Sequence, residues 1–211
     1  MANNARENIL NRIKQALKQP VPVPFPSSEG KETVFQPSLQ DLEISFAENF
    51  TQLQGRFSYC ENEAELAVQL NLLAAQRKWA NVFCVEESLK SILTEKGFTN
   101  HTATDLATCD ASITYCEQLI ARTGSMLLSS GQPSGRTVSV YAPVHICVAY
   151  TDQLVYDISD GFNSLIDRYR LELPSLITLA SGPSRTADIE KTLVVGVHGP
   201  KEVFCFLLER Q

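Results

Sequence analysis

The sequence predicts an α/β protein with a mostly parallel sheet flanked by helices. Amphipathic helical patterns alternate with short apolar runs along most of the chain, which is typical of α/β folds. The last run, 203–208, is continuously apolar, as expected for a strand that is buried on both faces of a sheet. With 211 residues, 44% of them hydrophobic, the chain is long enough for one sizeable core.

Residues 1–30 are expected to form an appendage, and residues 31–211 a single α/β domain. The appendage begins with an amphipathic helix over 4–18, whose apolar face consists of Ile9, Ile13, Ala16 and Leu17. Alternating prolines from Pro20 to Pro26 exclude helix and central strand, and favour an extended spacer. Two roles stay open for the helix: it packs on its own domain, or it binds a partner.

In the first half of the domain, cap signals define the helices. Ser38 with Asp41 has the form of a capping box, and Gly55 marks the end of the helix that follows. Asn62 followed by Glu65 predicts the start of the next helix. The elements expected here are helices ending near Leu53 and Lys78, a third over 87–96, and strands over 81–85 and 111–116.

From Gly124 onward the chain is richer in β-forming residues. Gly131 to Gly135 predicts a turn between the first two of these runs. A helix over 161–169 is expected to point Phe162, Leu165, Ile166 and Tyr169 inward. The strands expected in this half cover 125–130, 137–141, 146–150, 154–157, 176–180 and 203–208.

The segment 176–200 combines an apolar run with an abrupt turn. The run ends at Ser181-Gly182-Pro183-Ser184, where Gly and Pro fix the turn and the hydroxyls are able to cap a helix that follows. Backbone N–H groups at such a turn point outward together and suit an anion. The alternative is that these residues only cap a helix.

Composition and charge exclude several classes of protein. A net charge of −6, with no basic stripe, argues against nucleic-acid binding. No apolar run approaches the length of a membrane span, and the first residues are not signal-like, so a cytoplasmic protein is expected. The six cysteines contain no Cys-x-x-Cys pair and are interpreted as small buried hydrophobes, and no metal site is expected. Dinucleotide-binding, P-loop and nucleophile-elbow motifs are absent.

Three polar segments are predicted to meet at one end of the sheet, because ligands of open α/β sheets bind beyond the strand ends. Arg122, Arg136 and Arg185 would make this mouth positive and favour a small anion. His198 either lines the pocket or makes a loop hydrogen bond, and Asp188 acts either as a base or as a favourable charge at a helix N-terminus. His145 is expected to be a satisfied edge histidine. The candidate ligand-binding residues are Arg122, Thr123, Gly124, Ser125, Arg136, Ser181, Gly182, Ser184, Arg185, Thr186, Asp188, His198 and Gly199.

Two strings near the carboxyl terminus carry a family resemblance. Ser181 to Glu190, Ser-Gly-Pro-Ser-Arg-Thr-Ala-Asp-Ile-Glu, is followed by Val194-x-Gly-Val-His-Gly-Pro200. With Arg122 to Leu128 and Pro143 to Val148, these strings resemble the LUD-domain family, in particular the lactate-utilisation protein C group (LutC/YkgG). The resemblance covers most of the chain.

The resemblance implies a NagB/RpiA/CoA-transferase-like α/β fold and a part in oxidising L-lactate to pyruvate. It implies a subunit without its own redox centre, which binds a small carboxylate or a partner, while sister proteins carry the iron–sulfur clusters. One departure is a charge reversal: the family's Ala-Glu-Thr-Gly-Thr is Ala-Arg122-Thr-Gly-Ser here, so any acid–base role of that Glu is absent. The alternative is a stand-alone enzyme acting on a sugar phosphate or CoA ester.

Overall fold

The computed structural model describes residues 2–18, 40–170, 172–186 and 194–210. These fall into two compact units, Met1–Gln36 and Pro37–Gln211. Helix α1 (Ala2–Ala16) belongs to the first unit and matches the amphipathic helix that the sequence predicts. The expected spacer from Pro20 to Pro26 lies outside the described residues.

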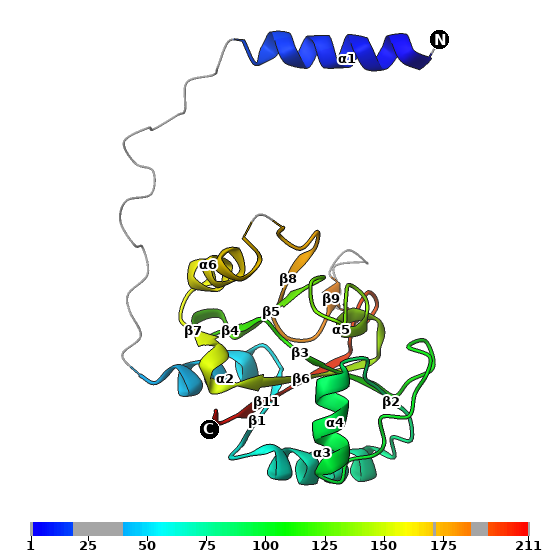
Figure 1. Ribbon diagram of the computed structural model, residues 1–211, viewed down its shortest axis with the longest axis vertical. Helices are drawn as coiled ribbons and strands as arrows, with labels where there is room; N and C mark the ends of the chain where they lie inside the picture. The colour runs from blue at the N-terminus through cyan, green and yellow to red at the C-terminus, as the bar shows by residue number, and fades with distance from the viewer. Residues whose placement is uncertain (1, 19–39, 171, 187–193, 211) are drawn as a thin grey trace. The chain divides into compact units, whose positions relative to one another are not determined.

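A five-stranded parallel sheet is the centre of the second unit (Figure 1). Its order is β1-β11-β6-β3-β2, and every neighbouring pair is parallel. The mostly parallel α/β fold predicted from the sequence is therefore confirmed. The strands are β1 (Arg56–Cys60), β2 (Val82–Phe83), β3 (Ala111–Tyr115), β6 (Val144–Tyr150) and β11 (Glu202–Leu208).

Both faces of this sheet are covered, which explains the continuous apolar run in β11. Phe204, Phe206 and Leu208 belong to the core under helices α3 (Glu63–Arg77) and α4 (Glu87–Glu95). Val203, Cys205 and Leu207 belong to the opposite core, with Phe46 and Phe50 of α2 (Leu42–Gln52). Alternate side chains of a strand point to opposite faces, so each face needs its own apolar set.

A second sheet covers the α2 side of the parallel sheet (Figure 1). Its order is β7-β4-β5-β8, in which β5 pairs antiparallel with both neighbours. Helix α6 (Ile158–Tyr169) contacts β4 and β7. The strands are β4 (Gln118–Ile120), β5 (Ser125–Ser129), β7 (Leu154–Val155) and β8 (Ile177–Ala180).

Of the two helix starts predicted from cap residues, that of α3 is confirmed and that of α2 is partly wrong. The Asn62 side chain accepts a hydrogen bond from the Glu65 N–H at 3.0 Å, as the cap pattern predicts. Helix α2 begins at Leu42 with Asp41 at its N-cap, but Asp41 makes no side-chain cap hydrogen bond. The capping box predicted at the start of α2 is therefore not formed by Asp41, and Ser38 lies outside the described residues.

Two expectations about secondary structure differ from the structure, and one strand was not predicted. The run 137–141, expected as a strand, forms a single helical turn, α5 (Val138–Tyr141). Val138 is buried, and its carbonyl accepts a hydrogen bond from Ser112 Oγ at 2.8 Å. Strand β1 was not predicted. Phe162 and Ile166 of α6 are 38% and 48% exposed, so only part of the expected inward face is buried. Strand β8 is half-buried, because it lies at the edge of its sheet.

The turn at Ser181–Ser184 does not cap a helix. The residues directly after it form β9 (Arg185–Thr186), which pairs antiparallel with β10 (Val194–Val195). The expected helix N-terminus is therefore wrong at this position. No helix among the described ranges is long and apolar enough to cross a bilayer.

Candidate functional site

Part of the predicted residue set surrounds a recess of about 170 Å³ at the amino-terminal ends of the parallel strands, here called the amino-edge recess. Gly182, Ser184, His198 and Gly199 line it, together with His145 and Val203 at the starts of β6 and β11 and with residues of β5 and β8. The Ser184 N–H donates to the Pro200 carbonyl at 3.0 Å. The Gly-Pro-Ser and His-Gly-Pro segments therefore lie together, as the sequence predicts.

The Thr-Gly-Ser segment lies beside this recess and packs against α2. Ser125 Oγ and Ser181 Oγ are 2.7 Å apart, which joins the segment to the Ser181 turn. Gly124 has φ +58°, and a Cβ built there would lie 2.4 Å from the Phe50 nitrogen. Asn49 Nδ2 donates to the Ala121 carbonyl at 2.9 Å. Gly124 therefore permits a close backbone approach, which is a structural role.

The three arginines do not form the predicted positive mouth. Arg122 Nε lies 2.7 Å from Asp157 Oδ2, and this hydrogen bond lowers the pKa of Asp157. Arg185 Nη2 donates to the Leu53 carbonyl at 2.6 Å, and Arg136 donates to Ser175. None of the three lines the amino-edge recess. Thr123 does not line it either, while Asp188 and the side chain of Thr186 lie outside the described residues.

His145 is satisfied, but it lies on a central strand of the sheet. Its Nε2 is 2.9 Å from Thr114 Oγ1, and the side chain is 1% exposed. Burial lowers the pKa of His145 to about 4, so the ring is neutral at physiological pH. A neutral histidine cannot supply the positive charge that was expected of the predicted mouth.

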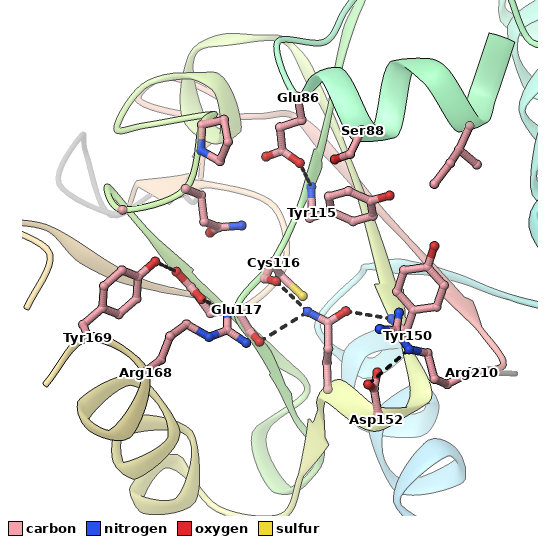
Figure 2. A pocket seen from close by; sticks show the side chains of 15 residues that line it. Glu86, Ser88, Tyr115, Cys116, Glu117, Tyr150, Asp152, Arg168, Tyr169 and Arg210 are labelled. Atoms are coloured by element: carbon pink, nitrogen blue, oxygen red, sulfur yellow. Dashed lines mark hydrogen bonds and ion pairs between the residues drawn. The ribbon is translucent and has the colours of Figure 1, made fainter.

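A larger cavity, of about 550 Å³, opens at the carboxyl-terminal ends of the parallel strands (Figure 2). We call it the carboxyl-edge pocket. Glu86 follows β2, Glu117 follows β3, Tyr150 ends β6 and Arg210 follows β11. Arg168, at the end of α6, closes another side. This edge is where open α/β sheets bind their ligands, and none of these residues was among the predicted candidates.

Glu86 is the buried acid of this pocket and the N-cap residue of α4. It is 2% exposed, and its Oε2 accepts from the Tyr115 N–H at 2.9 Å. Its Oε1 has no hydrogen-bond partner among the described residues. Burial raises the pKa of Glu86, and the negative charge of Glu117 raises it further. Hydrogen bonding from the Tyr115 N–H and the adjacent Ser134 acts in the opposite direction and lowers this pKa. Ser134 lies beside the carboxyl but does not reach hydrogen-bond geometry with Oε1.

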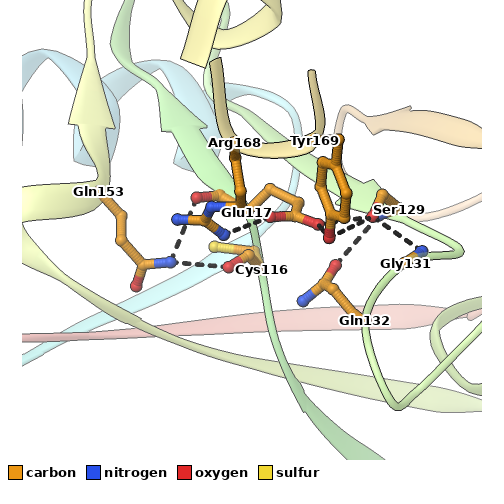
Figure 3. A network of polar contacts seen from close by, with 8 residues as sticks. All are labelled: Cys116, Glu117, Ser129, Gly131, Gln132, Gln153, Arg168 and Tyr169. Atoms are coloured by element: carbon orange, nitrogen blue, oxygen red, sulfur yellow. Dashed lines mark hydrogen bonds and ion pairs between the residues drawn. The ribbon is translucent and has the colours of Figure 1, made fainter. Parts of the chain in front are cut away.

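Glu117 is the second buried acid, and both of its oxygens are bonded (Figure 3). Oε1 accepts from Ser129 Oγ at 2.5 Å and from Tyr169 Oη at 2.7 Å. Oε2 accepts from Arg168 Nη1 at 2.5 Å. Because each oxygen has a partner, Glu117 holds the pocket wall together, whereas Glu86 presents a free acceptor.

Two tyrosines and a second arginine form the remaining wall (Figure 2). The rings of Tyr115 and Tyr150 are 6.2 Å apart, and the Arg210 guanidinium lies 4.7 Å from the centre of the Tyr150 ring. Arg210 Nε is 3.4 Å from Asp152 Oδ2. Two carboxylates of the pocket, Glu117 and Asp152, thus have an arginine partner, and the part of the chain that the structure describes shows no salt bridge to Glu86.

A weak sequence signal for this pocket exists. Glu86 and Glu117 each come directly after an apolar run, and polar residues at the ends of parallel strands gather at one edge. The sequence predicts that three glycine-containing segments meet beyond the strand ends; the Gly-Pro-Ser and His-Gly-Pro segments lie together at the amino edge, away from this pocket. Within the described ranges, no three His, Cys, Asp or Glu side chains are arranged to hold a metal ion.

Comparisons with known proteins give the chain its family. An uncharacterised protein of Neisseria meningitidis serogroup B is 26% identical and covers 95% of this chain and 91% of its own. Proteins named lactate utilization protein C from Halalkalibacterium halodurans and Deinococcus radiodurans are 40% and 36% identical. These two matches span only 43% and 47% of this chain, and 40% and 46% of the relatives.

A solved structure and a family model extend the comparison. The crystal structure of a DUF162 family protein from Deinococcus radiodurans has a TM-score of 0.57, with 19% identity, 79% of this chain and 96% of that chain covered. That likeness concerns the fold. The LUD domain model matches residues 44–208, which include both edges of the parallel sheet. The chain therefore belongs to the LUD-domain family.

Proposed function

We propose that this chain is a subunit without its own redox centre that serves lactate utilisation and binds a small carboxylate in the carboxyl-edge pocket. The observation that carries the proposal is the buried Oε1 of Glu86, which has no hydrogen-bond partner among the described residues and belongs to a side chain that lines the same cavity as Arg168 and Arg210. Relatives named lactate utilization protein C support the process. The pocket supplies a hydrogen-bond acceptor and two cations, which suit a hydroxyl and a carboxylate.

The carboxyl-edge pocket is a better candidate than the amino-edge recess. It is about three times larger, 550 against 170 Å³, and lies at the edge where the strand topology places ligands. Guanidinium groups have five donors each, so Arg168 keeps donors for a ligand after its bond to Glu117. The recess is lined mainly by apolar side chains and glycines.

Partner proteins are part of the proposal. Electron transfer through iron–sulfur clusters needs closely spaced thiolates, and this sequence has no Cys-x-x-Cys pair. We therefore assign the iron–sulfur centres of the system to sister subunits. All six cysteines are free thiols, which favours a reducing compartment, so the proposal places the chain in the cytoplasm.

A second candidate function comes from the size of the pocket. A cavity of 550 Å³ is large for a three-carbon acid and falls in the range that suits a drug-sized ligand. This observation favours a larger anion such as a sugar phosphate or a CoA ester, on which the chain would act as a stand-alone enzyme.

Thermal-shift measurements separate the two candidates. Lactate, pyruvate, phosphosugars and CoA esters are added to the full chain, because a ligand that binds only the folded state raises Tm. At a concentration of 100 Kd the stabilisation is about 2.7 kcal/mol, which is a shift of roughly 5–10 °C for a domain of this size. The first candidate requires a shift with lactate or pyruvate.

The chain offers a matched pair of variants for the same measurement. Arg210 and Arg56 are both more than half exposed, both pair with a carboxylate and both lie over an aromatic ring, but only Arg210 lines the pocket. The Arg210→Gln variant is expected to need at least ten times more ligand than the wild type for the same rise in Tm. The Arg56→Gln variant is expected to need the same concentration as the wild type. A shift with phosphosugars or CoA esters alone would favour the second candidate, and no shift with any compound would refute both.

A further inference from the structure

The free oxygen of Glu86 sets a requirement on the ligand. The Tyr115 N–H holds the carboxyl of Glu86, a residue of the carboxyl-edge pocket, through Oε2 (Figure 2), while Oε1 is buried and has no hydrogen-bond partner among the described residues. A buried charged acceptor without a partner is costly, typically by more than a neutral one. A ligand that donates a hydrogen bond to Oε1 removes this cost, and one that presents an acceptor there increases it.

The groups around Glu86 do not remove this requirement. Tyr115 faces the carboxyl from β3 and Ser134 from the loop before α5, Glu117 adds a second negative charge, and the Cys84 thiol, just after β2, contacts only the backbone carbonyl of Glu86. On α4, Ser88 lines the same pocket. Lys90, one turn along α4, pairs with Glu87. None of these groups donates a hydrogen bond to Oε1.

We propose that Glu86 Oε1 distinguishes 2-hydroxy acids from 2-oxo acids in this pocket: the ionised carboxylate accepts a hydrogen bond from the hydroxyl and repels a carbonyl oxygen. This inference rests on the proposed function, because it concerns the carboxylate that the pocket binds. An ionised carboxylate is an acceptor only, whereas the protonated form donates one O–H. The protonated form therefore suits the 2-oxo acid.

Ligand choice is then linked to a proton. The hydroxy acid favours the ionised form of Glu86 and the oxo acid favours the protonated form, so exchanging one ligand for the other moves one proton between Oε1 and solvent. Burial raises the pKa of Glu86, which brings this change closer to neutral pH. Both acids are anions and both bind more weakly when Glu86 is charged, so the ratio of their affinities isolates the contact at the 2-position.

The test compares matched acids over a range of pH in which all of them remain carboxylates. Dissociation constants of lactate and pyruvate, and of the larger pair 2-hydroxyisocaproate and 2-oxoisocaproate, are measured by NMR titration of the full chain. The preference for the hydroxy acid over its oxo partner is expected to rise at least tenfold from the acid to the alkaline limit. In Glu86→Gln the amide both donates and accepts, so the preference becomes small and independent of pH.

Glu87→Gln is the control, because Glu87 is the next residue and its side chain is 82% exposed. It is expected to retain the pH-dependent preference of the wild type. Calorimetry of the wild type in two buffers of different ionisation enthalpy measures the proton directly and needs no variant. Binding with a preference that does not change with pH, or a Glu86→Gln protein that keeps the change, would overturn the inference alone. If neither pair of acids binds, the proposed function fails with it.

Discussion

Replacing Gly124 by alanine tests whether the Thr-Gly-Ser segment is held by a close contact with α2. Gly124 has φ +58°, and an added Cβ would lie 2.4 Å from the Phe50 nitrogen and 2.5 Å from the Asn49 carbonyl carbon. Those atoms belong to helix backbone, which cannot rotate away as a side chain does. The substitution therefore adds two costs: the left-handed backbone, about 1 kcal/mol, and overpacking, about 1–3 kcal/mol.

Gly135 provides a control that carries only the first cost. Its φ is +64°, and an added Cβ would meet no atom within 4 Å. Gly135→Ala is therefore expected to lower the free energy of unfolding by about 1 kcal/mol and Gly124→Ala by about 2–4 kcal/mol. Both variants carry the cost of the left-handed backbone, so the difference between their losses, about 2 kcal/mol, is the cost of overpacking against α2 alone.

Urea unfolding of both variants beside the wild type gives these values from the midpoints, provided that the m-values agree. For a domain of this size the difference is also a gap of roughly 4–8 °C in Tm. Equal losses in the two variants would refute the claim that Gly124 is needed for a close approach to α2.

Three further predictions concern buried polar groups. Burial lowers the pKa of His145 from 6.5 to about 4, so on acidification the histidine of the unfolded chain is protonated before that of the folded chain. The free energy of unfolding should therefore fall by about 3 kcal/mol as the pH is lowered from 6.5 to about 4. His145→Gln should show a shallower fall. Burial raises the pKa of Cys60 to about 12 and of Cys84 to about 11, so native protein at pH 8 should react with iodoacetamide far more slowly than protein in urea; rapid native labelling of either would contradict this. Ser129→Ala removes a donor to Glu117 and should cost about 1.5–3 kcal/mol in urea unfolding, and a loss below 0.5 kcal/mol would show that the bond is not important.

The sequence predicts elements best where one physical requirement dominates the pattern. The run 203–208 is apolar at every position because both faces of β11 are covered, and no surface helix satisfies that pattern. The segment 137–141 has β-forming residues, but it lies between Gly135 and Pro143 and makes one helical turn that buries only Val138. Tertiary context decided that segment, as it commonly does for short runs.

The candidate site was harder to predict, because its residues have no local pattern. Glu86 and Glu117 are single polar residues that follow strands, and a single Glu before a helical pattern is also an ordinary first-turn residue. The Gly-Pro-Ser and His-Gly-Pro segments stand out in the sequence because turns need special residue types. These turn motifs indicate where the backbone makes tight contacts. The pocket, in contrast, depends on which edge of the parallel sheet each segment reaches, and no local motif shows that.

Strand β5 connects the prominent motif to the pocket. At its start, Ser125 bonds with Ser181 of the motif, and at its end Ser129 donates to Glu117 in the pocket wall. All five of its residues are buried, and it pairs with β8 in a register that places Met126 opposite Ala180 and Ser129 opposite Ile177. A slip of one residue would turn Ser129 away from Glu117 and leave a buried carboxylate short of a donor. The Thr-Gly-Ser and Ser-Gly-Pro-Ser segments therefore serve the pocket from the opposite edge, by fixing the register of the strand that carries its wall.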